Sequence, residues 1–210
     1  SEGLDSPMLV AAEFTSHPGT RRLPAKLLAL WNTVKAADFA GRPERDSSAV
    51  RVCDYKILDA LRRVQDWEGQ GGLVWVHHIE MGQWAYEMFK AAGIDALHCP
   101  AGEDANRAIC DPANKDRIVI ASMSAHGTGK NLQHFQRQLF LQWPRSAVTA
   151  EQTIGRTHRN GQQADELIVE TMLTTRFDEL LFAACLNDAV YIQQTTGTRN
   201  KVVYCSYDPL

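Results

Sequence analysis

The chain has 210 residues, enough for one domain with a short appendage. Hydrophobic residues make up 44% of it and charged residues 22%, which is the balance of an ordinary globular protein. The formal net charge of −3 excludes a surface that is basic all over, so any contact with nucleic acid must come from a local patch.

Five cysteines are scattered along the chain without a C-x-x-C pair, so the sequence indicates neither a zinc site nor a disulfide framework. No apolar run reaches membrane-spanning length, and no signal peptide opens the chain. We therefore expect reduced thiols and a cytoplasmic or nucleoid-associated protein that is not secreted and contacts no membrane. Because the chain begins with Ser1 rather than Met, we also expect it to be part of a longer one.

Residues 1–70 predict a helical extension and linker. Pro24 suits the first position of a helix, and the apolar residues that follow recur at helical spacing up to Val34. A polar loop over 41–48 precedes a second helix, for which Asp54 is the expected N-cap. The residues expected on the buried side of this second helix are Ile57, Leu58, Leu61 and Val64.

After Gly72 the pattern changes to short apolar runs that alternate with amphipathic segments. Strands are expected at 73–76, 95–99, 117–122, 139–143 and 167–172, and a helix that ends at Gly93 lies between the first two. Continuous apolar strands separated by helices are typical of parallel β-α units. The sequence therefore predicts a three-layer α/β domain over 71–190 with a mostly parallel sheet. The C-terminal tail, 191–210, is expected to add one strand at 202–207.

The most informative segment is 152–162, with the sequence QTIGRTHRNGQ, which holds Arg156 and Arg159 three residues apart. On a helix, residues i and i+3 share one face, so both guanidiniums are expected to point at one target. The guanidinium is a rigid, positively charged fork that suits a polyphosphate, so one interpretation is a nucleotide site. The alternative interpretation is that the two arginines lie on a solvated helix face. We expect the pair beside an open groove at the carboxyl edge of the sheet. Gln152 has a second possible role as a helix cap, because it lies three residues after Thr149.

A glycine-rich turn over 125–131 follows an expected strand but departs from a phosphate-binding loop. Ser124 stands where the first glycine of G-x-x-x-x-G-K-[S/T] belongs, and Asn131 replaces the hydroxyl that would bind magnesium. The acidic pairs 165–166 and 178–179 do not follow apolar strands, and we interpret them as structural, so no metal site is predicted. A nucleotide site must therefore be completed by another domain. A free-standing nucleotide-binding enzyme that uses the turn at Lys130 is a further hypothesis.

These segments resemble motifs of the superfamily 2 helicases in their Swi/Snf-like form. Residues 152–162 resemble motif VI, Q-A-I-G-R-A-H-R-I-G-Q, from which they differ at Thr153, Thr157 and Asn160. Residues 122–132 resemble motif V, S-T-R-A-G-G-L-G-I-N-L, and residues 73–78 resemble motif IV. The resemblance covers about residues 56–189. It implies a RecA-like fold and the C-terminal lobe of an ATP-dependent helicase or translocase.

The resemblance also implies roles for individual residues. In such proteins ATP and Mg²⁺ bind between two lobes, and the N-terminal lobe supplies the phosphate loop and the metal carboxylates. Arg156 and Arg159 would act on ATP as arginine fingers. The other residues implied for the ATP site are Gly129, Asn131 and Gln152. The residues implied for nucleic acid, which we expect to be double-stranded DNA, are Ser122, Ser124 and Lys130.

Two departures from motif V bear on this interpretation. Met123 stands where the family has threonine, and Ser124 stands where it has arginine. They motivate an alternative hypothesis, a non-catalytic RecA-like module that binds a partner or nucleic acid. In the leading hypothesis the partner of this chain is the N-terminal RecA-like lobe of the same protein, and the chain alone is inactive.

Overall fold

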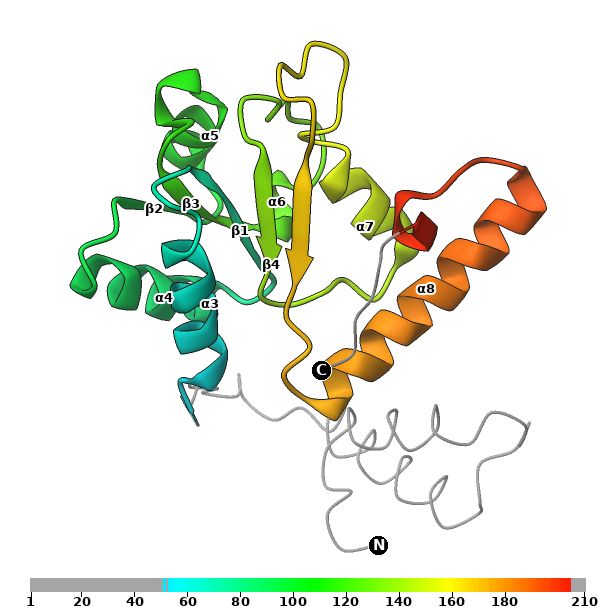
Figure 1. The fold of residues 1–210 in the computed structure, drawn as a ribbon, viewed down its shortest axis with the longest axis horizontal. Coiled ribbons are helices and arrows are strands. Elements are labelled where there is room, and N and C mark those ends of the chain that lie inside the picture. Colours follow the sequence, from blue (N-terminus) through cyan, green and yellow to red (C-terminus); the bar gives the residue numbers. More distant parts are fainter. Residues whose placement is uncertain (1–50, 52, 205–210) are drawn as a thin grey trace, which may run out of the picture. The chain divides into compact units, whose positions relative to one another are not determined.

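The computed structural model describes Arg51 and residues 53–204 (Figure 1). These residues belong to a compact unit that begins at Arg51. The helix expected after Pro24 lies outside the described residues.

A five-stranded sheet, with all strands parallel, forms the middle of the domain. Its strands are β1 (Gly72–Val76), β2 (Ala96–Cys99), β3 (Ile118–Ser122), β4 (Arg137–Phe140) and β5 (Ile168–Thr171), in the order β2-β3-β1-β4-β5. The prediction of an α/β fold with a parallel sheet is confirmed. Strand β4 begins and ends earlier than expected: Leu141 still donates to the carbonyl of Trp75 at 3.0 Å, and beyond it the chain turns so that Trp143 packs against Phe182.

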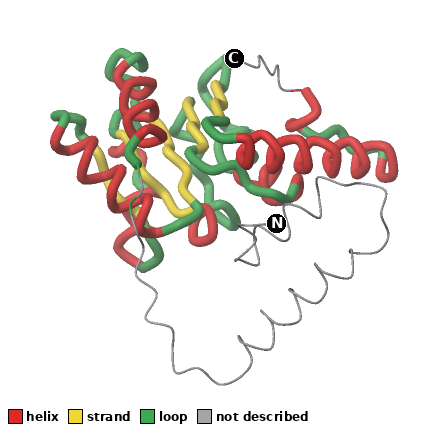
Figure 2. The backbone as a smooth tube through the Cα atoms, turned by 90° about the horizontal axis from the view of Figure 1, so that it is seen from below, coloured by secondary structure: helices red, strands yellow, loops and turns green. Residues whose placement is uncertain are grey.

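Helices cover both faces of this sheet (Figure 2). On one face lie α3 (Tyr55–Gln65) and α4 (Ile79–Ala91), whose residues Ile57 and Phe89 share a buried cluster with Val74 of β1. The opposite face carries α5 (Glu103–Cys110), α6 (Met123–His126), α7 (Ala147–Ile154) and α8 (Arg176–Thr196). Trp75 of β1 belongs to the cluster on that second face. Because successive strand residues point to opposite faces, one apolar strand supplies both cores, which gives three layers.

Helix α3, grouped above with the helical extension, packs on α4 and on the sheet. Its buried residues are Ile57, Ala60 and Val64, whereas Leu58 is 49% exposed. The expectation that Leu58 is buried is therefore wrong, because the buried face of the helix follows Ile57, Ala60 and Val64, at i, i+3 and i+7, and Leu58 lies beside that face. Asp54 does precede the helix, but its side chain pairs with Arg51 instead of capping.

The C-terminal part of the described chain is helical. Helix α8 ends at Gly197, whose φ of 70° suits glycine, and is followed by the 3₁₀ helix η2 (Lys201–Tyr204). The expectation of a strand from 202 is wrong for residues 202–204; residues 205–207 lie outside the described chain. The backbone N–H of Lys201 donates to Glu151 at 2.7 Å and that of Val202 to Asn200 at 3.0 Å. These donors are thus engaged by side chains and are not available to a sheet.

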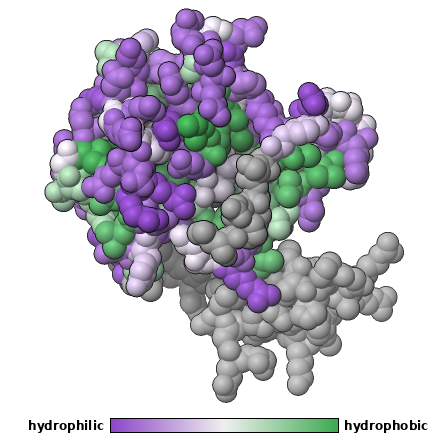
Figure 3. Space-filling view, in the orientation of Figure 1, coloured by the Kyte–Doolittle hydropathy of each residue, from purple (hydrophilic) through white to green (hydrophobic). Residues whose placement is uncertain are grey.

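Helix α8 begins with a capping box between Thr175 and Asp178, so the structural interpretation of the acidic pair 178–179 is confirmed. Apolar side chains of α8 remain at the surface, among them Phe177 and Leu180 near its start, and Figure 3 shows hydrophobic surface over this helix. Within the part of the chain that the structure describes, no helix combines the length and the hydropathy needed to cross a membrane.

Candidate functional site

The two arginines lie on a turn that follows α7, which we call the arginine turn and define as residues 155–162. Helix α7 begins at its cap Ser146, whose hydroxyl accepts from the N–H of Thr149, and ends at Ile154. The prediction that the arginines share a helix face is therefore wrong. Gly155 follows the helix, and Gly161, with a φ of 98°, allows a conformation that a helix excludes. Because Ser146 is the cap, Gln152 does not have the capping role considered above.

The arginine turn lies at the amino edge of the sheet. The carbonyl of Arg156 accepts from the N–H of Leu132 at 3.0 Å, and the side-chain amide of Gln162 donates to the carbonyl of Phe135 at 3.2 Å. Both partners lie just before β4, so the turn adjoins the beginning of that strand. In Figure 1 it is the yellow loop at the end of β5 away from the arrowhead. The expectation of a site at the carboxyl edge is wrong, because α7 runs back along the sheet before the turn begins.

Arg156 is held by backbone oxygens, and no carboxylate among the described residues pairs with it. Its Nε donates to the carbonyl of Gln152 at 2.8 Å and its Nη1 to the carbonyl of Lys130 at 3.3 Å. Burial, and then the positive charge of Arg159, lower the pKa of the Arg156 guanidinium below its usual value. The two cations therefore repel each other, and an anion placed between them would relieve that repulsion.

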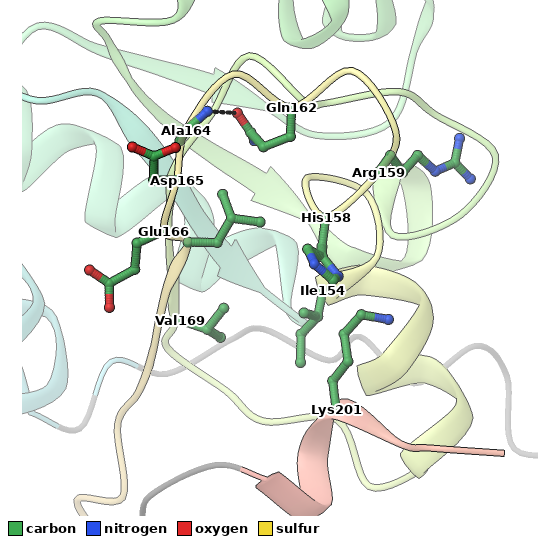
Figure 4. A pocket seen from close by; sticks show the side chains of 10 residues that line it. Ile154, His158, Arg159, Gln162, Ala164, Asp165, Glu166, Val169 and Lys201 are labelled. Atoms are coloured by element: carbon green, nitrogen blue, oxygen red, sulfur yellow. Dashed lines mark hydrogen bonds between the residues drawn. The ribbon is translucent and has the colours of Figure 1, made fainter. Parts of the chain in front are cut away.

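Arg159 is exposed, and none of the described residues forms a hydrogen bond or an ion pair with its side chain. Figure 4 shows this side chain extending away from the carboxylates of Asp165 and Glu166. Thus the turn presents one fixed guanidinium and one that is free to reach a ligand. This is the arrangement a polyphosphate needs, because a planar guanidinium can donate two parallel hydrogen bonds to phosphate oxygens.

A cavity of about 470 Å³ adjoins the arginine turn (Figure 4). Its apolar lining comes from Ile154, Leu167 and Val169, and its polar lining includes His158, Arg159, Gln162 and Lys201. Lys201 did not stand out in the sequence. It reaches the cavity because η2 is fixed to α7 by the ion pair between Lys201 and Glu151, which are 50 residues apart in sequence.

The other residues implied for the ATP site lie near Arg156. The carbonyls of Gln152 and Lys130 both accept from its guanidinium, and Asn131 follows Lys130 as an exposed residue. Gly129 has a φ of 72°, a conformation that favours glycine, and open space surrounds the position of a Cβ. The structure thus brings two parts of the chain together, the segment of Asn131 and the continuous stretch of Gln152 and the arginine turn.

The three residues implied for nucleic acid are not brought together. Ser122 is buried at the end of β3, and its hydroxyl lies 2.9 Å from that of the exposed Ser124. Lys130 adjoins Arg156 at the other edge of the sheet, and its amine donates to Asn106 of α5 at 2.8 Å. Ser124 is therefore the only one of the three whose side chain is exposed in the described structure.

Two further residues of the motif V segment, Met123 and His126, are buried. Met123 belongs to the core, as does His126, whose Nε2 lies 2.6 Å from the carbonyl of Pro100. Because His126 has no exposed surface, it serves the turn and does not contact a phosphate. Burial lowers the pKa of its imidazole, so the ring is neutral at pH 7.

The sequence did not indicate how the arginine turn is fixed. The side chain of Gln162 donates to the carbonyls of Thr157 and Phe135, both at 3.2 Å. Its oxygen accepts from the N–H groups of Gln163 and Ala164. One amide therefore closes the turn on itself and attaches it to the segment before β4. Among residues 51 and 53–204, no group of three or more His, Cys, Asp or Glu side chains could hold a metal ion.

Comparison with known proteins bears on the fold. No family model and no curated protein matches this chain. Among solved structures, the chain is similar to the crystal structure of the C-terminal part of the Fun30 ATPase domain, with a TM-score of 0.52 and 17% sequence identity. The similarity covers 76% of this chain and 52% of the other, so this chain spans about half of that structure. At this identity the comparison shows a shared fold, a RecA-like α/β lobe.

Proposed function

We propose that this chain is the C-terminal lobe of an ATP-dependent helicase or translocase that acts on nucleic acid. Arg156 and Arg159 would act on ATP held by a separate N-terminal lobe. The observation that carries this proposal is the arginine turn, in which the guanidinium of Arg159, which pairs with none of the described residues, lies close enough to the fixed guanidinium of Arg156 to lower its pKa. The similarity to part of a protein described as an ATPase domain supports the same function.

The arginine turn would act by stabilising negative charge. During phosphoryl transfer, charge develops on the oxygens of the γ-phosphate, and an arginine finger that meets this charge is worth about 10³–10⁵ in rate. Arg156 is already oriented by two carbonyls, so little entropy is lost when it binds. Arg159 would complete the contact when the two lobes close.

The described residues do not provide the remaining parts of a nucleotide site. The turn at 125–131 lacks the first glycine and the hydroxyl of a phosphate loop. When Mg²⁺ is bound with ATP, it neutralises phosphate charge, and we propose that its carboxylates belong to the N-terminal lobe. Because ATP would bind between the two lobes, its hydrolysis would change their relative position and so move the protein along nucleic acid.

Double-stranded DNA is the proposed nucleic acid, with Ser124 as a phosphate contact. The burial of Ser122 and Met123 and the engagement of Lys130 by Asn106 favour a weaker contact than the motif implies. The same observations support the second candidate, a non-catalytic module that keeps this fold. The two candidates differ in one property, which is whether ATP turnover depends on the arginine turn.

The test is to join this chain to its N-terminal lobe and measure ATP hydrolysis with and without DNA. We expect DNA-stimulated turnover in the joined protein, none in this chain alone, and loss of turnover in Arg159→Ala with DNA binding retained. Arg62→Ala is a matched control, because Arg62 is a surface arginine that pairs with Asp59 on α3. Normal turnover in Arg159→Ala would refute the role of this residue. DNA binding by a joined protein without ATP turnover would favour the non-catalytic module.

A further inference from the structure

A chain of buried hydrogen bonds runs from the middle of the sheet to the arginine turn. The indole Nε1 of Trp75 in β1 donates to Oε1 of Gln138 in β4 at 2.8 Å. The Nε2 of Gln138 donates to Oγ1 of Thr157 at 2.6 Å. None of the three residues is more than 1% exposed. This network thus connects β1 and β4 with Thr157, which lies between Arg156 and Arg159 in the sequence.

Every polar side-chain atom of this hydrogen-bond network has a partner. The Nε2 of Gln138 also donates to the carbonyl of Ile154 at 3.3 Å, and the hydroxyl of Thr157 lies 3.3 Å from the same oxygen. A buried amide or hydroxyl without a partner is costly, whereas a completely paired network in an apolar core holds its members in one arrangement. The network therefore fixes the last residue of α7 and the arginine turn relative to β4.

The residue types in this network suit fixation of the turn. Gln138 is the second residue of β4, and its register partners on the two neighbouring strands are the apolar residues Leu73 and Val169. A leucine at this position would need no polar partner. Thr157 stands where the helicase motif quoted above has alanine, which has no side-chain hydroxyl. Both polar groups point to the same acceptor, the carbonyl of Ile154 at the end of α7.

The position of Arg159 depends on the backbone of the turn, because its own side chain forms no hydrogen bond or ion pair with the described residues. A displacement of about 1 Å at a catalytic group can cost about 10²-fold in rate. We propose that Gln138 and Thr157 are positioning residues, which act through the arginine turn to direct Arg159 at its anion. This inference rests on the proposed function only for the identity of that anion.

Three variants of the 210-residue chain test the positioning role. Thr157→Val keeps the shape of the side chain but removes the hydroxyl, and Thr157→Ser keeps the hydroxyl. The double variant Gln138→Leu with Thr157→Val is made in a chain that also carries Trp75→Phe, because the buried indole N–H would otherwise lose its acceptor; no buried donor is then orphaned, and the protein is expected to stay folded. Hydrogen exchange of the amides of Thr157, Arg159 and Gln162, which all donate within the turn, reports its local order.

We expect these amides to exchange at least about tenfold faster in Thr157→Val and in the double variant, while Thr157→Ser matches the original chain. Amides in α4, on the other face of the sheet, are the internal control and should not change. A role limited to core stability makes a different prediction, because the double variant would then regain the original exchange in the turn. That result would overturn the inference.

Turnover in the joined, two-lobed protein gives the second readout. In the double variant, kcat should fall about 10–100-fold with an unchanged KM for ATP, and Thr157→Ser should retain activity. If Arg159→Ala leaves turnover unchanged, the proposed role of Arg159 fails, yet the exchange experiment still decides whether Gln138 and Thr157 fix the turn. An unchanged kcat in the double variant, together with a large loss in Arg159→Ala, would refute the positioning role of Gln138 and Thr157 and leave the role of Arg159 intact.

Discussion

The carboxylate of Asp178 provides a quantitative test of the structural interpretation of the acidic pair at the start of α8. Its Oδ1 accepts from the amine of Lys56 at 2.6 Å, and the two side chains are only 9% and 16% exposed. Its Oδ2 accepts from the backbone N–H and the hydroxyl of Thr175 and from the hydroxyl of Thr174. Asp178 thus attaches α8 to α3 and closes the capping box.

Asp178→Ala should destabilise the domain through two separate effects. Removing one partner from a buried ion pair costs about 3–5 kcal/mol, and slight exposure of both side chains favours the lower end of that range. Loss of the reciprocal contact in the capping box adds about 1 kcal/mol. We therefore expect the free energy of unfolding to fall by about 4 kcal/mol, which corresponds to a decrease in Tm of about 10 °C at this chain length.

Urea denaturation followed by circular dichroism measures this loss. Glu179→Ala is the matched control, because Glu179 is the exposed neighbour in the same helical turn and interacts mainly with the helix dipole, at a cost of about 0.3–1 kcal/mol. Lys56→Met should cost less than Asp178→Ala, since Asp178 keeps its threonine donors. If Asp178→Ala and Glu179→Ala differ by less than about 1 kcal/mol, the assignment of Asp178 as a structural residue is wrong.

Two further predictions follow from the titrating groups. Burial raises the pKa of the Cys99 thiol to about 11, so it should resist iodoacetamide at pH 8 while exposed Cys110 is labelled; rapid labelling of folded Cys99, seen by mass spectrometry, would contradict this. Burial also lowers the pKa values of His98, His126 and His134. The unfolded chain therefore binds protons before the folded one as pH falls below about 6.5, so stability should be lower at pH 5 than at pH 7. Denaturation at the two pH values measures the difference, and equal or greater stability at pH 5 would oppose this reasoning.

The sheet could be predicted because its information is local. Strands β1 and β3 are buried on both faces, so their residues form continuous apolar runs that stand out from the helices beside them. The buried face of helix α3 was harder to predict from the sequence, because its amphipathic pattern includes both Leu58 and Ala60. Only packing on the sheet decides which of them is buried.

The candidate site was less predictable, because its geometry depends on partners far apart in the sequence. The motif shows Arg156 and Arg159, but it cannot show that α7 stops at Ile154 or that the turn adjoins the segment before β4. Gln138 lies 19 residues before Thr157, inside a strand where nothing in the local pattern indicates a hydrogen-bond partner. Such contacts become visible only when the strands and α7 are placed together.

Arg159 is proposed to meet charge that develops while ATP is cleaved. The most direct measurement is the single-turnover rate of ATP cleavage in the joined, two-lobed protein at saturating ATP and DNA, compared with Arg159→Ala. We expect the cleavage rate to fall by about 10³ or more, with little change in the affinity for ATP. A cleavage rate within about tenfold of the original, in a variant that binds ATP and DNA normally, would contradict it.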